Sequence, residues 1–223
     1  MLSYQGKFWK IPPGDTPWDL ETTDKWGKGV ENGILKQVGV VPKPLQKPHP
    51  QVFQPFASSE RSIRWCAAND VTAILPPMHE KIERNLFEVY ADASGRPLGD
   101  GVGMLRDIVI ADTDEEAMEL WQNSGPFTAN AWFVPFGFRK GMEDPDTGGT
   151  PTPEEAIANG YALVGSVDTV TRSLETLKAK LPVNWVFGWT HDMLIPHAKL
   201  MKSIELFKTK VLPRVAEPAS PVL

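Results

Sequence analysis

Beyond residue 50, short apolar runs alternate with segments whose apolar residues recur every three or four positions. Such runs are typical of buried strands, and the three-to-four spacing is typical of amphipathic helices. The runs predict four strands, at residues 52–57, 71–75, 105–111 and 184–188. Helices are predicted over residues 60–69, after the proline pair 76–77, after Thr113, over residues 167–180, and through the last apolar stripe to near Pro213.

Strands that alternate with helices favour a parallel sheet joined by right-handed crossovers, so the chain is expected to be an α/β protein. Four strand–helix units suit a doubly wound sheet, and they also suit half of an eight-unit barrel. The pattern by itself leaves both possibilities open.

The first 50 residues show no sustained period and are rich in proline, glycine, lysine and tryptophan. Residues 42–50 contain four prolines, which favour an extended, irregular path. We therefore expect an irregular segment at 1–50, a β/α domain at 51–215 and a short tail at 216–223. Residues 137–160 are rich in Gly, Pro and acids, and are expected to form a mobile surface loop or lid.

Composition narrows the class of protein. The net charge of −5 is mild and there is no basic stripe, so nucleic-acid binding has little support. No apolar stretch approaches the roughly 20 residues of a membrane span. The single cysteine, Cys66, fits a reducing compartment. The expectation is a soluble, cytoplasmic protein.

The junction of the first strand with its helix is the first candidate site. Ser58 and Ser59 stand at the start of the helix, and Ser62 follows one turn later. Serine is a preferred helix N-cap, which is the ordinary interpretation. The free amides of a helix N-terminus also bind phosphate, and ligands of parallel α/β folds gather at the carboxyl ends of strands. Local pattern favours the cap and leaves the anion site open.

Other candidate chemistry is sparse. The four histidines lack metal-ligand spacing, so no metal site is expected. There is no G-x-S-x-G elbow for a hydrolase nucleophile. Cys66 is expected to pack within its helix. Trp189 and His191 follow the fourth strand, where they could line a substrate pocket, although a structural role for His191 is equally compatible.

Five motifs in order resemble the bacterial luciferase-like flavin monooxygenase family. They are YQGKFWKIPP, PKPLQKPHPQVF, ASSERSIRWCAANDVTAILPP, ALVGSVDTV and KSIELFKTKVLPRV, and together they extend from about residue 4 to residue 215. The resemblance implies a TIM-type (β/α)8 barrel that binds reduced FMN, or a deazaflavin in some branches, and uses it to activate oxygen.

The resemblance also assigns roles to residues of this chain. The flavin phosphate is expected on the turn formed by Ala57, Ser58 and Ser59, with the hydroxyl of Ser62, and Pro77 is expected near the flavin ring. Residues 137–160 match the family's mobile loop. A flavin reductase would supply the reduced flavin, and a small organic molecule would be the substrate. No catalytic side chain is assigned.

The motifs match only the later part of the family, strands five to eight. The first four strands, which carry further phosphate contacts, have no counterpart here. We therefore expect either a homo-oligomer or association with a missing N-terminal half. Three functions follow from the resemblance: a monooxygenase of small organic substrates, a non-catalytic subunit that binds flavin or a partner, and a deazaflavin-dependent reductase.

Overall fold

The structure is a computed structural model that describes residues 1–26, 28–39, 42–190 and 194–216. The chain divides into two compact units, Met1–Pro50 and Gln51–Leu223. Each unit is described by itself.

The first unit is built from two short antiparallel hairpins and one helix. Strand β1 (Tyr4–Gln5) pairs with β2 (Lys10–Ile11), and β3 (Val30–Glu31) pairs with β4 (Ile34–Leu35); helix α1 is Glu21–Trp26. Asn32 and Gly33 link β3 to β4 with φ of 52° and 73°. An Asn-Gly pair at positive φ is the preferred two-residue hairpin turn. The segment thus has local order that its irregular composition did not indicate.

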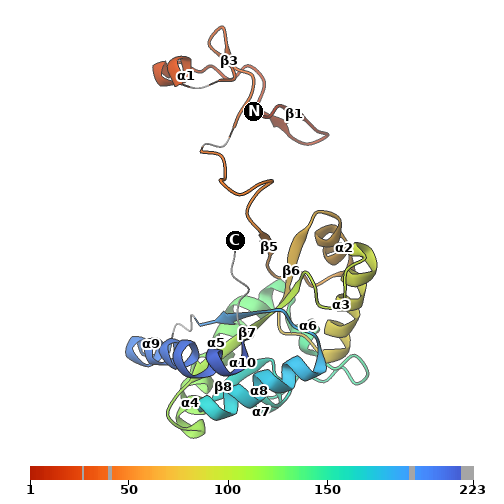
Figure 1. The fold of residues 1–223 in the computed structure, drawn as a ribbon, viewed down its shortest axis with the longest axis vertical. Coiled ribbons are helices and arrows are strands. Elements are labelled where there is room, and N and C mark those ends of the chain that lie inside the picture. Colours follow the sequence, from red (N-terminus) through yellow and green to blue (C-terminus); the bar gives the residue numbers. More distant parts are fainter. Residues whose placement is uncertain (27, 40–41, 191–193, 217–223) are drawn as a thin grey trace. The chain divides into compact units, whose positions relative to one another are not determined.

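The second unit contains a five-stranded parallel sheet (Figure 1). Its strands are β5 (Val52–Gln54), β6 (Val71–Leu75), β7 (Val102–Ile110), β8 (Ala162–Gly165) and β9 (Trp185–Trp189). Strands β5, β6 and β7 are neighbours, and both β8 and β9 pair with β7.

The long central strand β7 has a fork along one edge. Gly103 pairs with Ile74 of β6 and also with Trp185 of β9, so β6 and β9 lie on opposite edges. Asp107 pairs with β8 and also with β9. Strands β6 and β8 therefore share the same edge of β7, β6 along its first half and β8 along its last.

Three strand predictions need correction. The third strand was predicted over residues 105–111, but β7 begins at Val102, because Val102 and Gly103 pair with β6 despite the glycine-rich run around them. Strand β8 was not predicted, because a run of four apolar residues next to a helix cap is too short to show a period. The first strand was predicted to reach residue 57 but ends at Gln54, because Phe56 turns the chain with φ of 55°. Strands β6 and β9 lie within one residue of their predicted bounds.

The helices follow the strands as the apolar periods predict. They are α2 (Glu60–Ala68), α3 (Glu80–Ser94), α4 (Asp114–Gln122), α8 (Val167–Lys180) and α9 (His197–Leu206), followed by a π-helix at Phe207–Val211 and α10 at Leu212–Val215. After α4 come α5 (Gly125–Thr128), a π-helix at Ala129–Phe133 and a 3₁₀-helix at Val134–Phe136. Residues 137–160, predicted as a loop, contain α6 (Arg139–Met142) and α7 (Pro153–Ala158).

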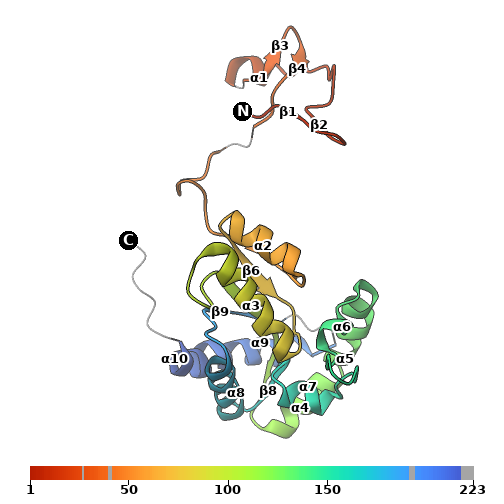
Figure 2. The ribbon, with the colours of Figure 1, turned by 90° about the vertical axis from the view of Figure 1, so that its right-hand side faces the viewer.

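One face of the sheet is covered by helices (Figures 1 and 2). Val102 and Met104 of β7 pack with the apolar faces of α2 and α3. Ile108 and Ile110, farther along the same strand, pack against α8 and the final helical segment. Because alternate residues of β7 point to this face, Arg106 lies on it too, between Met104 and Ile108, and separates the two apolar clusters.

The opposite face of the sheet is concave. The ring of Phe53, on β5, has its centroid 5.3 Å from the rings of both Trp185 and Phe187, on β9. Strands β6 and β7 lie between these two strands, and neighbouring strands are about 4.8 Å apart. The sheet must therefore curl for the rings to meet. It forms part of a barrel wall, not a closed barrel.

No helix in the described ranges is long and apolar enough to cross a lipid bilayer.

Candidate functional site

A cavity of about 230 Å³ opens beside the fork. Its walls are mainly apolar and include Pro76 and Pro77 after β6, Leu105 on β7, and Tyr161 and Ala162 where β8 begins. The carboxyl end of β6 and the first residues of β8 thus bound the same space. Ligands of parallel sheets usually bind beyond the carboxyl ends of strands, and here only β6 faces the cavity with that end, whereas β8 borders it with its amino end.

Helices from the long β7–β8 connection complete the walls of the cavity. Trp121 at the end of α4, Phe133 and Met142 contribute apolar surface. Helix α7 begins with a reciprocal capping box, in which Thr152 Oγ1 accepts from the amide of Glu155 and Glu155 Oε2 accepts from the amide of Thr152. Residues 137–160, predicted as a lid, thus contain helices and line part of the cavity. That this segment opens and closes remains a prediction.

The polar groups on the cavity wall are few. Trp121 Nε1 donates to Asp107 Oδ2 at 3.4 Å, and the side chains of Asn130 and Arg139 are exposed at the rim. Burial raises the pKa of Tyr161 to about 12, so its phenol is neutral and can donate a hydrogen bond at neutral pH. An apolar pocket with a few polar groups is typical of sites for small organic molecules.

The N-terminus of α2 has the cap that local pattern predicted. Ser59 Oγ accepts from the amide of Ser62 at 3.3 Å and lies 2.9 Å from Ser62 Oγ. The Ser58 and Ser59 side chains are exposed, so the first turn offers hydroxyl donors to solvent. Glu60 in this turn carries a negative charge that opposes anion binding; its carboxylate accepts a hydrogen bond from Asn85 Nδ2, on α3, at 3.3 Å.

The predicted cofactor residues do not all meet in one place. Of the five, Pro77 lines the cavity, whereas Ala57, Ser58, Ser59 and Ser62 do not. Ala57 is fully buried and donates its amide to Ile74 O at 3.0 Å, which fixes the turn before α2. The structure does not test whether these residues bind a cofactor, so their role remains a prediction.

The predicted substrate residues are Trp189 and His191. His191 lies outside the described residues. Trp189 is not among the residues that line the cavity. The centroid of its ring lies 5.6 Å from the centroid of the ring of Phe133, which does line the cavity. Phe56 and Phe138 pack beside the same pair. The indole Nε1 of Trp189 is buried without a hydrogen-bond partner in the described structure.

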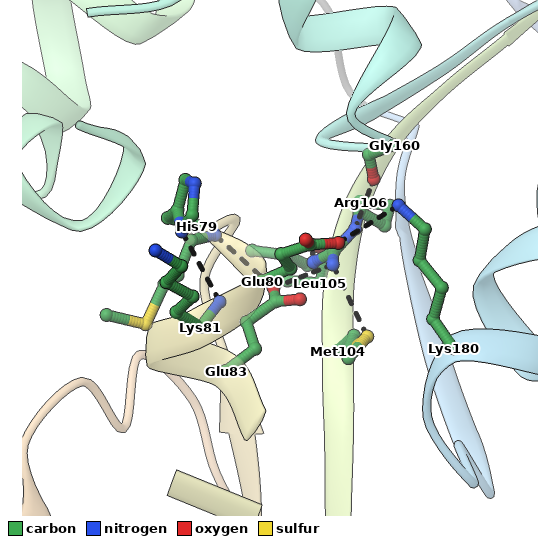
Figure 3. Close-up of polar contacts among 10 residues, drawn as sticks. His79, Glu80, Lys81, Glu83, Met104, Leu105, Arg106, Gly160 and Lys180 are labelled. Carbon is green, nitrogen blue, oxygen red and sulfur yellow. Dashed lines mark hydrogen bonds and ion pairs between the residues drawn. The ribbon is translucent and has the colours of Figure 1, made fainter. Parts of the chain in front are cut away.

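A buried ion pair was not predicted; its two residues are not among those that line the cavity. Arg106 Nη2 donates to Glu83 Oε1 at 2.7 Å, and the two side chains are 1% and 4% exposed (Figure 3). Burial raises the pKa of Glu83, and the guanidinium of Arg106 opposes that change. An arginine and an aspartate inside the apolar run LRDIVIA were the sequence signal for both Arg106 and Asp107.

Metal and thiol chemistry find no support in the described part of the chain. No three His, Cys, Asp or Glu side chains there lie close enough together to hold a metal ion. Cys66 is fully buried on α2, and burial raises the pKa of its thiol. A buried thiol of raised pKa is a poor nucleophile.

Comparison with known proteins gives fold neighbours only. No protein-family model and no curated protein matches the chain. The solved structure of the monooxygenase RslO1 from Streptomyces bottropensis aligns with a TM-score of 0.63 and 19% identity, over 91% of this chain and 56% of that one.

A second neighbour is the oxygenating constituent of 3,6-diketocamphane monooxygenase from Pseudomonas putida, a type II Baeyer–Villiger monooxygenase solved in complex with FMN. It aligns with a TM-score of 0.64 and 21% identity, over 97% of this chain and 59% of that one. This chain thus spans less than two thirds of either neighbour. The luciferase-like fold expected from the motifs is confirmed, as a partial barrel.

Proposed function

We propose that the chain forms the flavin-binding part of a luciferase-like monooxygenase, which uses reduced flavin and dioxygen to oxidise a small organic substrate. The observation that carries the proposal is the apolar cavity between the end of β6 and the start of β8, in a fold like that of two monooxygenases. An apolar, partly enclosed site excludes water, which such oxygen chemistry requires.

The residues after β5 fit the phosphate of FMN. Ser58, Ser59 and Ser62 supply hydroxyl donors, and the first amides of α2 carry the partial positive charge of a helix N-terminus. The side chain of Arg61 is exposed in the same turn and adds a full positive charge. Pro77, on the cavity wall, would contact the flavin ring. Bound there, reduced FMN would supply the electrons that activate dioxygen.

The cavity favours a compact, mostly apolar substrate. Trp121 and Met142 would contact its hydrocarbon part. Tyr161, neutral at pH 7, could donate a hydrogen bond to a substrate oxygen. A separate flavin reductase would supply the reduced flavin.

The test is a reaction of the purified chain with chemically reduced FMN, isotopically labelled dioxygen and a panel of small cyclic ketones and alkanes. Mass spectrometry should find one labelled oxygen atom in the product. Turnover without dioxygen, with a deazaflavin as cofactor, would instead identify a reductase. Absence of both reactions would refute an active enzyme and leave the second candidate.

The second candidate is a half-barrel that binds a further β/α unit without turnover. Strands β5, β8 and β9 each pair with one strand in the described sheet, and none of the three contains a charged residue. Exposed edges are usually protected by charges, proline or a cover, and parallel strands are usually buried. A second copy of the chain, related by a two-fold axis along the strands, would place each β5 beside the partner's β9.

The mass of the chain in solution tests this candidate. Light scattering should give twice the 24.7 kDa of one chain, and Gln54→Lys, on the exposed edge strand β5, should return the protein to one chain. Trp65→Lys, on exposed α2 away from the edges, is the matched control and should leave the dimer intact. A wild-type protein of single-chain mass would refute self-association.

A further inference from the structure

The fork in the sheet leaves part of β7 without a strand neighbour on one edge. Strand β6 pairs with β7 up to Met104, and β8 begins to pair at Asp107. Leu105 and Arg106 lie between these two ladders. A backbone carbonyl in such a gap needs another donor, since buried polar groups without partners destabilise the fold.

The guanidinium of Arg106 fills the gap. Its Nη1 donates to Leu105 O at 2.9 Å, and its Nε donates to Gly160 O at 2.6 Å. Gly160 directly precedes Tyr161, which lines the cavity together with Ala162, the first residue of β8. One side of the guanidinium is therefore bonded to the backbone that leads into the β8 wall.

Glu83 extends the contact to the opposite wall (Figure 3). Its Oε1 accepts from Arg106 and also from the amide of Met78 at 3.3 Å. Met78 directly follows Pro77, which lines the cavity at the end of β6. The pair thus joins three pieces of backbone that surround the cavity: the end of β6, the middle of β7 and the entry to β8.

Burial of the charged side chains of Arg106 and Glu83 costs solvation free energy. Both side chains are almost fully inaccessible, and a buried ion pair contributes less to stability than apolar residues of the same size often would. The neighbouring ion pair of Lys180 with Glu80, by contrast, is exposed to solvent. A role in holding backbone segments in place therefore explains the buried pair better than a contribution to stability does.

We propose that Arg106 and Glu83 are positioning residues that fix the spacing of the two cavity walls. They touch neither substrate nor cofactor, and they act through Gly160 and Met78. The effect on ligands rests on the proposed function of the cavity, whereas the effect on the walls does not.

Hydrogen–deuterium exchange and flavin titration of the double variant Glu83→Leu/Arg106→Met test the proposal. Leucine and methionine keep much of the apolar volume, so the melting temperature should stay near that of the wild type. Exchange should quicken roughly tenfold at residues 78–79 and 161–163, with little change in the rest of the sheet. The Kd for reduced FMN should rise by a similar factor.

Arg84→Met is the matched control. Arg84 lies on the same helix and donates to Lys180 O at 2.8 Å, but it bonds to neither cavity wall. It should leave exchange at both walls unchanged. Unchanged exchange in the double variant, or an equal rise throughout the sheet, would overturn the positioning role.

Arg106→Lys provides the second variant if the double variant fails to fold. Lysine keeps the charge beside Glu83 but loses the fork of donors, so exchange should quicken at residues 161–163 and not at Met78. An equal increase in exchange at Met78 and at residues 161–163 in Arg106→Lys would refute the proposal. If the wild type binds no flavin, the proposed function fails, and the exchange data still decide the positioning role.

Discussion

Replacing Phe53 by alanine tests the curl of the sheet. Phe53 is half-buried and makes two edge-to-face contacts, with Trp185 and Phe187. Truncation of a fully buried Phe costs 3 to 5 kcal/mol, so half burial suggests about 2 kcal/mol. Each aromatic pair adds about 0.5 kcal/mol at the lower end of its range. The free energy of unfolding should fall by about 3 kcal/mol.

Urea unfolding followed by tryptophan fluorescence measures this loss. Phe53→Leu should lose less, because leucine keeps apolar volume without the ring geometry. Trp65→Ala, at a side chain that is 53% exposed on α2, should lose under about 1 kcal/mol. If Phe53→Ala lost no more than Trp65→Ala, β5 and β9 would not meet across the concave face, and the partial-barrel description would be wrong.

Three further predictions concern single polar groups. Burial raises the pKa of Tyr161 to about 12, above its unfolded value, so the stability it contributes is complete below about pH 10 and lost between about pH 10 and 12. An absorbance titration should contain a phenol that ionises near pH 12, and Tyr161→Phe should remove that component. Ser203→Ala removes the hydroxyl that accepts from the buried Ile110 amide at 2.8 Å; urea unfolding should show a loss of about 1 to 3 kcal/mol. The amide of Ser166 holds the pKa of Asp114 below its usual value, so its contribution is present above the unfolded pKa and lost as pH falls through the folded one. Asp114→Asn should therefore reduce the acid-side slope of stability against pH, and an unchanged slope would contradict the assignment.

The sequence predicts the regular parts of the second unit well. Helix α8 occupies the predicted residues, because Ser166 caps its start and the stripe of Val170, Leu174 and Leu177 has one helical period. Ser59 likewise caps α2. These features depend on neighbours along the chain, which is the information that a single sequence contains.

Features that depend on distant residues could not be predicted in the same way. Strand β8 exists because residues 162–165 pair with the end of β7, more than 50 positions earlier. Arg106 is buried because Glu83 and Gly160 meet it at the fork. The cavity is likewise formed by segments that the pattern treated separately. Trp189, predicted to line a pocket, packs beside Phe133 of the cavity wall, and its role in substrate binding remains a prediction.

The flavin site is the central claim, and its most direct test is an anaerobic titration of the protein with reduced FMN and with reduced riboflavin, which lacks the phosphate. The account predicts saturable binding of FMN, weaker binding of riboflavin, and loss of that difference in Ser59→Ala. Thr152→Ala, which removes an equivalent cap from α7, should keep the difference. No saturable binding, or equal affinity for the two flavins in the wild type, would contradict a phosphate site at the start of α2.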